Sequence, residues 1–226
     1  MLSAICSLLL MPNAPQKTAY FVDANKKAPA YEVKIPKIAG SAAATACTTN
    51  AIALAKKELA NYVKEAKQLI KEWPESKTRY MFDMEGFVRA NKTEFSCIQI
   101  DHYIDMAGAH PNHTSYMIRM GIVKGNLKKV ELKDVFKNGA AGQLFCNDKI
   151  VEKLKKEEAS WVMEEDFREL TDTQLSRWYP TKEGIQFIFP PYEVASYAEG
   201  EKEALVKWSD VKQFIDPNGP LGSYIK

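Results

Sequence analysis

The 226-residue sequence predicts an α+β protein in which an antiparallel β-meander packs on a long helix and a smaller α+β lobe follows. Three observations carry this prediction. One stretch repeats apolar residues at helical spacing over about six turns. Three neighbouring runs alternate like strands and are joined by short links, and the second half mixes one helical stretch with short strands. We therefore expect residues 15–124 to form the first lobe and residues 125–226 the second.

The composition is that of an ordinary globular protein. Hydrophobic residues make up 46% and charged residues 27% of the chain. Its 31 Lys and Arg residues nearly balance 29 Asp and Glu residues, which leaves a net charge of +2. This balance gives no electrostatic footprint for DNA or RNA, so we expect no nucleic-acid partner.

Residues 1–14 form a candidate signal segment. The apolar run from Leu2 to Met11 is too short to span a bilayer as a helix, but its length suits the core of a secretory signal. Ala14 and Ala19 are small enough for a cleavage site, and Cys6 raises the alternative of a lipid anchor. We expect an exported, periplasmic or envelope-associated protein without a membrane span in the mature chain. The alternative is a buried N-terminal strand or helix.

Two strand-like runs and a helical repeat open the first lobe. Residues 18–24 and 30–40 alternate like strands, and Pro36 restricts the second strand to a sheet edge or to its own end. A helix is expected to begin at a cap on Thr49 or Asn50 and to stop before the proline at position 74. The apolar residues at helical spacing are Ile52, Ala55, Leu59, Tyr62, Val63, Ala66, Leu69, Ile70 and Trp73.

Residues 78–90, 94–106 and 115–125 then alternate like the strands of a meander. The expected core-facing residues are Ile98, Ile100, His102 and Ile104 in the second strand, and Tyr116, Ile118, Met120 and Ile122 in the third. Because the links between the strands are short, neighbouring strands should run antiparallel, with the long helix packed on their apolar side.

The second lobe begins with a Gly-Asn turn at Gly125, a short strand and a turn of helix. A second helix is predicted over residues 147–162, with Asn147 or Asp148 as its cap and Trp161 facing inward. A strand from Gly184 should be interrupted by two consecutive prolines at 190 and 191. A last strand and a closing helix capped by Ser209 complete the lobe.

The stretch "GAHPNHTSYMIRM" holds two of the three histidines of the chain. His110 and His113 have the spacing of zinc ligands, but a third ligand would have to come from elsewhere. Pro111 and Asn112 are turn residues, which favours a structural or contact loop. We therefore expect no metal and no cofactor. The sequence contains no nucleophile-elbow, phosphate-loop or dinucleotide-binding motif, and its four cysteines form no C-x-x-C pair.

The stretch "FPPYEVASYAEG" combines rigid prolines with tyrosines and a carboxylate. Pro191, Tyr192, Glu193 and Tyr197 would offer contact area at a low cost in conformational entropy, as a binding surface requires. The alternative is that Tyr192 and Tyr197 pack a corner between two strands.

Three fragments, "YEVKIPKIAG", "GAHPNHTSYMIRM" followed by "LKKVELKDVF", and "GIQFIFPPYEVASYAEG", together resemble a known family. They are similar to the paired domains of unknown function in the extracytoplasmic anti-sigma factor RsiV and in the non-catalytic N-terminal part of PdaC-type peptidoglycan deacetylases. Ala107 stands where the family usually has Gly, Pro190 where it often has Asn, and Ser196 where it often has Pro or Gly.

The resemblance implies an envelope-facing α+β module. In RsiV this region recognises lysozyme through contacts that include the Pro-Tyr-Glu bend, which corresponds here to Pro191, Tyr192 and Glu193. The expected function is therefore an exported, non-catalytic binding module that recognises a wall-active protein such as lysozyme or a peptidoglycan fragment. Two alternatives stay open: a small metal-dependent hydrolase of cell-wall material that uses His110 and His113 with Glu193, and a purely structural envelope protein.

Overall fold

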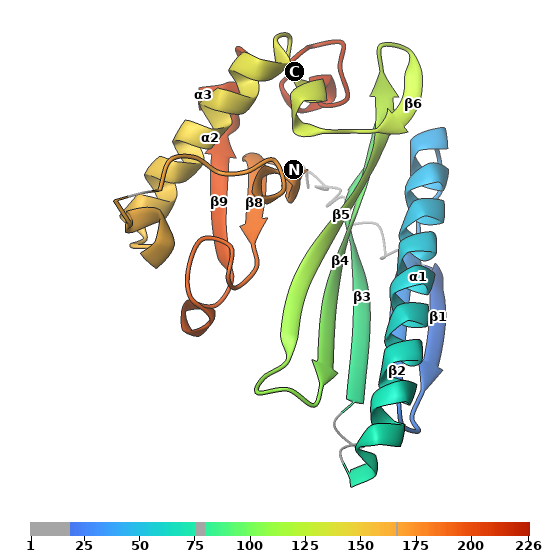
Figure 1. Ribbon diagram of the computed structural model, residues 1–226. Helices are drawn as coiled ribbons and strands as arrows, with labels where there is room; N and C mark the ends of the chain where they lie inside the picture. The colour runs from blue at the N-terminus through green and yellow to red at the C-terminus, as the bar shows by residue number, and fades with distance from the viewer. Residues whose placement is uncertain (1–18, 76–79, 166) are drawn as a thin grey trace, which may run out of the picture.

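The computed structural model describes residues 19–75, 80–165 and 167–226, which fold into two β-sheets with helices packed on them (Figure 1). Six strands form the first sheet in the order β1-β2-β3-β4-β5-β6, and three strands form the second in the order β7-β8-β9. The predicted α+β class is confirmed. The candidate signal segment 1–14, with Cys6, lies outside the described residues.

The elements have the following bounds. The first sheet contains β1 (Ala19–Asn25), β2 (Ala30–Lys37), β3 (Tyr80–Asn91), β4 (Phe95–Met106), β5 (Asn112–Val123) and β6 (Asn126–Lys129). The second sheet contains β7 (Trp178–Pro180), β8 (Gly184–Phe189) and β9 (Lys202–Lys207). The α-helices are α1 (Ala42–Glu72), α2 (Gly139–Lys156) and α3 (Trp208–Val211).

The expected three-stranded meander corresponds to β3, β4 and β5, and β6, which was expected in the second lobe, continues it as a fourth antiparallel strand. The pair β2 and β3 is parallel, because α1 carries the chain from the end of β2 back to the start of β3. Pro36 lies beyond the last β2–β3 pair, which joins Lys34 to Glu85, so its missing N–H does not interrupt that ladder. A Cβ atom added to Gly86 would lie only 2.5 Å from Pro36 Cδ, so a glycine is required at this approach.

Helix α1 begins earlier than predicted, at a cap on Ser41. The Ser41 hydroxyl accepts a hydrogen bond from Ala44 N at 3.0 Å. The predicted cap at Thr49 or Asn50 is wrong, because the alanine-rich stretch before these residues has high helix propensity. Thr49 and Asn50 instead donate to the carbonyl oxygens four residues back in the chain.

The buried face of α1 consists mainly of small side chains: Ala43, Ala44, Cys47, Ala51, Ala55, Leu59, Tyr62 and Ala66. They let the helix lie close to the first sheet, along β2, β4 and β5 (Figure 1). Trp73, which was expected on this face, is 59% exposed at the C-terminal end of the helix. The predicted end of the helix before Pro74 is confirmed.

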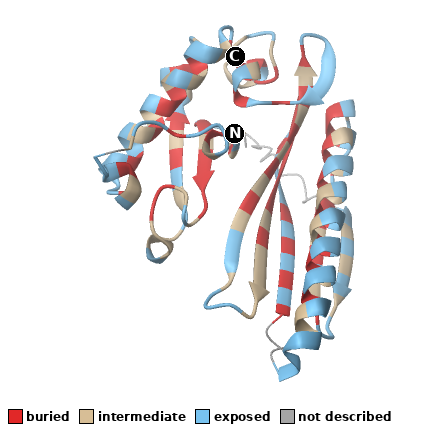
Figure 2. Ribbon diagram, viewed as in Figure 1, coloured by how far each residue is buried: buried red, intermediate tan, exposed pale blue. Residues whose placement is uncertain are grey.

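Strands β4 and β5 are covered on both faces, whereas β3 alternates between buried and exposed residues along its length (Figure 2). On the predicted apolar face, Ile98 and Ile100 are buried under α1, and the β5 residues Tyr116, Ile118 and Met120 are half-buried there. On the opposite face, Phe95, Cys97, Met117 and Arg119 are buried against the second lobe, so that β5 is more buried on the face that was expected to be polar. Phe95 stacks on Trp178 with ring centroids 6.0 Å apart.

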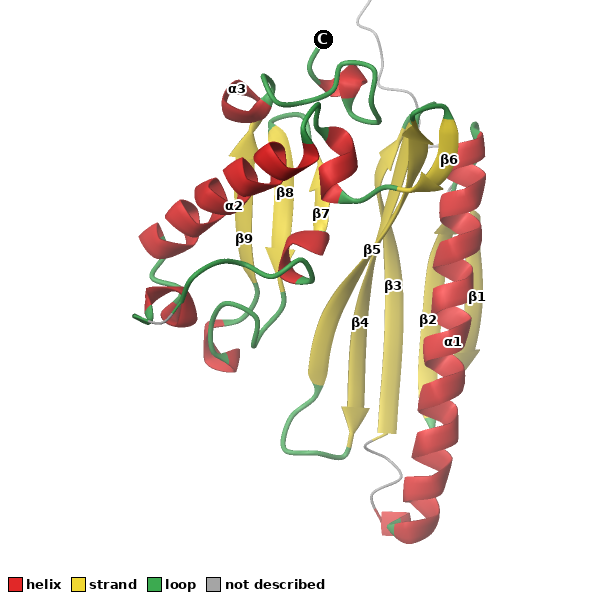
Figure 3. Cartoon of the chain, turned by 45° about the horizontal axis from the view of Figure 1, so that its top comes forward, coloured by secondary structure: helices red, strands yellow, loops and turns green. Residues whose placement is uncertain are grey.

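Helix α2 also begins earlier than predicted, and it crosses the second sheet (Figure 3). Its cap is Asn138, whose side chain accepts from Ala141 N at 3.2 Å. Asn147 is buried inside the helix and accepts a hydrogen bond from Leu170 N at 3.0 Å, so the predicted cap at Asn147 or Asp148 is wrong. The helix ends at Lys156, and Trp161 lies half-buried in a separate 3₁₀ turn.

Two smaller features complete the second lobe, and a third concerns its predicted boundary. The strand from Gly184 ends at Phe189, before the two prolines, as predicted. Helix α3 begins at Trp208 with Lys207 as its cap, so Ser209 lies inside the helix and does not cap it. The turn between β5 and β6 uses Lys124 and Gly125, both with positive φ, so the predicted lobe boundary at residues 124 and 125 falls within a hairpin of the first sheet.

The cysteines at 47, 97 and 146 are free and buried. Burial raises the pKa of each thiol to about 12. In the three described ranges, no helix combines the length and the apolar character that a membrane crossing would need.

Candidate functional site

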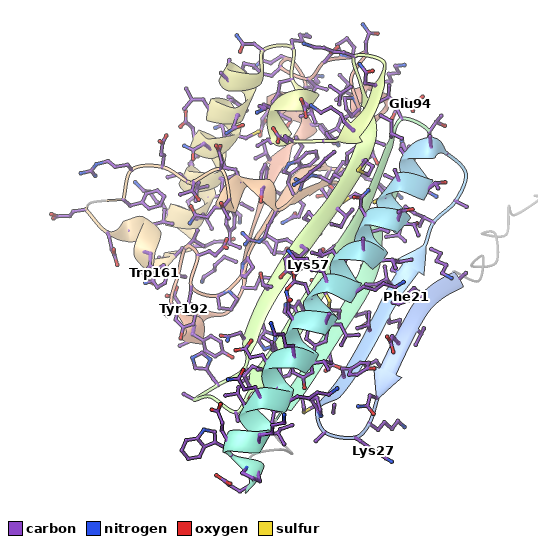
Figure 4. All side chains as sticks on the ribbon, turned by 45° about the vertical axis from the view of Figure 1, so that its right-hand side comes forward. Phe21, Lys27, Lys57, Glu94, Trp161 and Tyr192 are labelled. Atoms are coloured by element: carbon purple, nitrogen blue, oxygen red, sulfur yellow. The ribbon has the colours of Figure 1, made fainter. Side chains whose placement is uncertain are left out.

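Four aromatic side chains lie together at the loop of the β4–β5 hairpin. They are His110, Trp161, Tyr192 and Tyr197, and they are here called the aromatic cluster. The Tyr192 hydroxyl lies 3.1 Å from His110 Nε2, and the Tyr197 ring stacks on the His110 ring with centroids 4.4 Å apart. Trp161 extends the cluster, since its ring centroid lies 6.2 Å from that of Tyr192, and both side chains lie at one edge of the molecule (Figure 4). The cluster therefore joins three segments that are distant in the sequence.

The first segment is the loop of residues 107–111 between β4 and β5. Ala107 has φ +61°, in the left-handed region that favours glycine, and its N–H donates to Asp105 Oδ1 at 2.8 Å. His110 is exposed, and its Nδ1 lies 3.0 Å from the Pro111 carbonyl oxygen. The Tyr197 hydroxyl donates to the same carbonyl at 3.4 Å. The loop is thus held in place by the bend of the second lobe.

The second segment is the bend that follows β8. Tyr192 has φ +68°, an unusual conformation for an aromatic residue. Its N–H donates to Ala195 O at 3.1 Å, and Glu193 N donates to Pro190 O at 3.3 Å, which closes a tight turn after the two prolines. The Tyr192 side chain is 49% exposed. A non-glycine residue in this region costs about 1–2 kcal/mol, so the surrounding structure must hold it there.

Glu193 does not join the exposed surface. Its carboxylate receives a hydrogen bond from Arg177 Nη1 at 2.6 Å in an ion pair whose side chains are 15% and 18% exposed. Arg177 Nε also donates to the Ser115 carbonyl oxygen in β5 at 3.0 Å. Burial raises the pKa of the Glu193 carboxyl, and Arg177 opposes this rise. The sequence placed this carboxylate at the contact surface, whereas in the structure it ties the bend to the first sheet.

The third segment is the 3₁₀ turn Ser160–Met163, which carries Trp161. Glu199 connects this turn to the bend, because its carboxylate accepts from the hydroxyls of Ser160 at 2.5 Å and Ser196 at 3.0 Å. The hydrogen bond from Ser160 is the main reason why the pKa of Glu199 is lowered to about 2. Trp161 N also donates to Val194 O at 3.3 Å. These bonds fix Trp161 beside Tyr192.

A concave acidic surface adjoins the cluster. A pocket of about 290 Å³ reaches Tyr103, His113 and Pro190. It is lined by four carboxylates, which are here called the acidic groove: Asp83, Glu85, Asp101 and Glu201. Desolvation and the neighbouring charge of Asp101 raise the pKa of Glu201 to about 7. Asp101 is held by hydrogen bonds from Gln99 Nε2 at 2.6 Å and Ser115 Oγ at 2.8 Å. Lys34 pairs with Glu85 at 3.5 Å, and Glu201 is only about half ionised at neutral pH, so the groove carries a reduced negative charge beside the aromatic cluster.

The residues of the hydrolase alternative have separate partners. His110 belongs to the aromatic cluster, and His113 meets Tyr103 edge-on with ring centroids 4.9 Å apart. Glu193 is paired with Arg177. Among residues 19–75, 80–165 and 167–226, no group of three or more His, Cys, Asp and Glu side chains is placed to hold a metal ion.

The structure thus brings together His110, Pro111, Tyr192 and Tyr197, with Pro191 leading into the bend. Asn112 is the exposed first residue of β5 and pairs with Ile104. Sequence reasoning missed Trp161, which it assigned to the core side of a helix, and Arg177. The local sequence holds no signal for either role, because Trp161 contacts Tyr192 within the folded second lobe and Arg177 bonds to Ser115 of β5.

Comparison with known proteins finds a family that part of the chain resembles. Residues 133–209, which include Trp161, Arg177 and the whole bend, match the family described as "Protein of unknown function (DUF3298)". None of the curated proteins matches the sequence significantly.

Two solved structures of this family are similar to the chain over nearly its whole length. A DUF3298 family member from Bacteroides fragilis (BF2082) superposes with a TM-score of 0.64 at 16% identity, over 92% of this chain and 98% of that one. A DUF3298 family protein from Pseudomonas aeruginosa (PA4972) gives a TM-score of 0.53 at 13% identity, over 91% and 96%. At 13–16% sequence identity, the similarity to these two structures shows a shared fold. Residues 133–209 therefore resemble the DUF3298 domain, and the chain has a fold similar to that of two solved DUF3298 proteins.

Proposed function

We propose that this chain is a non-catalytic binding module of the bacterial cell envelope, which binds a basic wall-active protein such as a lysozyme through the aromatic cluster. The observation that carries the proposal is Tyr192, which is half-exposed, has a positive φ and is joined to His110 by its hydroxyl group. An aromatic side chain held at the surface in an unfavourable backbone conformation suggests a contact residue rather than a packing residue.

The rigidity of the cluster supports a binding role. Tyr192, Tyr197 and His110 are ordered by ring contacts and hydrogen bonds before any partner arrives. Binding would therefore cost little additional side-chain entropy, which is the usual advantage of a pre-organised aromatic anchor. Tyrosine and tryptophan are also the residue types that most often dominate binding energy.

The acidic groove favours a protein partner over a neutral glycan. Its four carboxylates lie beside the cluster, and lysozymes are commonly basic, so the two surfaces would attract each other. The similarity of the loop and the bend to the RsiV-type domains points in the same direction. A peptidoglycan fragment is the second ligand to test, because sugar rings also stack on exposed aromatic side chains.

The proposed location is outside the cytoplasm, in the periplasm or attached to the envelope. The apolar run of residues 2–11 is the sequence feature that supports export, and Cys6 is the residue that would carry a lipid anchor. The nearly balanced charge of the chain supports a partner other than nucleic acid.

The test is a binding measurement by biolayer interferometry, with hen lysozyme and a soluble muropeptide as separate ligands. We expect lysozyme to bind and the affinity to fall with added salt, since the groove is acidic. Tyr192→Ala should weaken binding at least about thirtyfold, which corresponds to about 2 kcal/mol. Tyr20→Ala is the matched control, because Tyr20 is 40% exposed on β1, outside the cluster. If neither ligand binds, or if both variants bind alike, the proposal is wrong.

A further inference from the structure

A larger pocket, of about 730 Å³, lies between β5, the segment after β6, the first half of α2 and residues 169–176. It shares no residue with the aromatic cluster or the acidic groove. Its volume falls within the range of about 300–1,000 Å³ that is typical of small-molecule sites. The function proposed above does not use this pocket.

Arg119 lines the pocket and is 2% exposed. Its Nε donates to Val130 O at 3.0 Å, and its Nη1 donates to the carbonyl oxygens of Ser176 and Trp178. The guanidinium also lies over the Trp178 ring, 4.5 Å from its centroid. Backbone carbonyls satisfy these donors without neutralising the charge, and no carboxylate of the described residues forms an ion pair with Arg119.

The remaining nitrogen of Arg119, Nη2, is available to a ligand. Nη2 donates to no atom in the part of the chain that the structure describes, and it is not among the polar atoms sealed from solvent. Burial lowers the pKa of Arg119 to about 10, so the guanidinium still carries its charge at neutral pH. The pocket wall thus holds a buried cation with a free donor nitrogen and no direct ion pair, with Glu131 as a more distant opposite charge. An oxyanion would accept from the free nitrogen and pair with the charge directly.

The other residues that line the pocket indicate which class of anion it would bind. The two lysines of the rim, Lys129 and Lys133, are outnumbered by the carboxylates of Glu131, Glu169 and Asp172. Arg119 is therefore the group that would attract an anion, and the rim gives no support for a second negative charge on the ligand. This arrangement suits a singly charged carboxylate better than a doubly charged phosphate. Four leucines also line the pocket, Leu132, Leu144, Leu170 and Leu175, and they would receive an apolar group.

We propose that this pocket binds a small molecule with a single carboxylate on an apolar body, and that the carboxylate accepts hydrogen bonds from Arg119 Nη2. The test is a ¹H–¹⁵N NMR titration of the full chain with N-acetyl-L-leucine, its neutral amide and inorganic phosphate. We expect saturable shifts of the Leu144 and Thr171 amides with N-acetyl-L-leucine, at least about tenfold tighter than with the amide. Equal affinities for the acid and the amide, tighter binding of phosphate, or no saturation by the acid would each overturn the proposal.

A matched pair of substitutions on α2 tests the location without disturbing Arg119. Ala140 is exposed and lines the pocket, whereas its neighbour Ala141 is exposed and does not. We expect Ala140→Trp to weaken binding of N-acetyl-L-leucine at least about tenfold and Ala141→Trp to leave it unchanged. Unchanged binding in Ala140→Trp would place the ligand elsewhere. Lysozyme binding should be the same in both variants, so this result stands apart from the test of the aromatic cluster.

Discussion

The Tyr192 hydroxyl lies 3.1 Å from His110 Nε2, and this hydrogen bond joins the bend of the second lobe to the hairpin loop of the first. His110 also stacks on Tyr197 and lies 3.0 Å from the Pro111 carbonyl through Nδ1. The histidine that suggested a metal site in the sequence is therefore the central member of an aromatic cluster. Four predictions follow from this and from related contacts.

The first prediction concerns the hydrogen bond itself. Tyr192→Phe and His110→Phe each keep a ring and remove one partner of the bond, so a double-mutant cycle isolates its energy. We expect a coupling of about 0.5–1.5 kcal/mol in urea unfolding. The control cycle pairs Tyr192→Phe with His113→Phe and should give no coupling, because His113 contacts Tyr103 instead. Equal coupling in the two cycles would contradict the assignment.

The second prediction concerns the hairpin loop. Ala107 has φ +61°, where an L-residue is strained and glycine is not. Ala107→Gly should therefore raise the free energy of unfolding by about 0.5–1 kcal/mol, after the larger entropy of glycine in the unfolded chain is subtracted. Ala109→Gly in the same loop is the control. Ala109 does not have a positive φ, so its replacement should be neutral or destabilising. A loss of stability in Ala107→Gly would show that the loop conformation is wrong.

The third prediction concerns His102, which is 8% exposed between Phe82 and Tyr116. Neither ring nitrogen has a hydrogen-bond partner within the described ranges, and burial lowers its pKa from 6.5 to about 4. As the pH falls from 6.5 to 4, His102 becomes protonated in the unfolded chain but stays neutral in the folded protein. The contribution of His102 to the free energy of unfolding, fully present above pH 6.5, is therefore lost as the pH falls to 4. The loss is on the order of 2–3 kcal/mol.

The measurement is the difference in unfolding free energy between the parent and His102→Met at several pH values. This difference removes the contributions of all other titrating groups, including Glu201. It should shift in favour of the methionine variant as the pH falls from 7 to 4. The same difference for Ile100→Val, on the same face of β4, should stay constant with pH. A constant difference for His102→Met would mean that the imidazole is hydrated in the folded state.

The fourth prediction concerns the face of α1. Leu59 is 8% exposed against the first sheet, whereas Lys57 is exposed on the outer side of the helix (Figure 4). Leu59→Ala should lower the free energy of unfolding by about 2–5 kcal/mol, because it removes buried apolar area and leaves a cavity. Lys57→Ala should change it by less than about 0.5 kcal/mol. Urea denaturation of the two variants gives both values, and equal losses would reverse the assignment of the faces.

The sequence was sufficient to predict the class of fold, the meander and the end of α1, because these depend on local periodicity and on proline. The starts of both long helices were missed for a local reason as well. Ser41 and Asn138 cap segments rich in alanine and glycine, where the apolar pattern that marks a helix face is weak. Strand β7 has only three residues, too few for an alternating pattern to be visible.

The candidate site was predictable only in part. Prolines at 190 and 191 required a turn, and this brings Tyr192 to the surface as expected. The partners of Glu193 and Trp161 could not be predicted, because Arg177 and Tyr192 are distant from them in the sequence and meet them only when the second lobe has folded. The same is true of Arg119, which appears in the sequence as an ordinary polar residue of an alternating strand.

Strands β4 and β5 have α1 on one side and the second lobe on the other. A substitution on either face must therefore be tolerated by two cores, since a shift of the shared backbone moves Ile98 and Ile118 together with Phe95 and Arg119. A fragment that encodes only one lobe would leave the apolar face of β4 and β5 that the other lobe covers open to solvent, so the two lobes are expected to fold as one cooperative unit even though their sheets are separate.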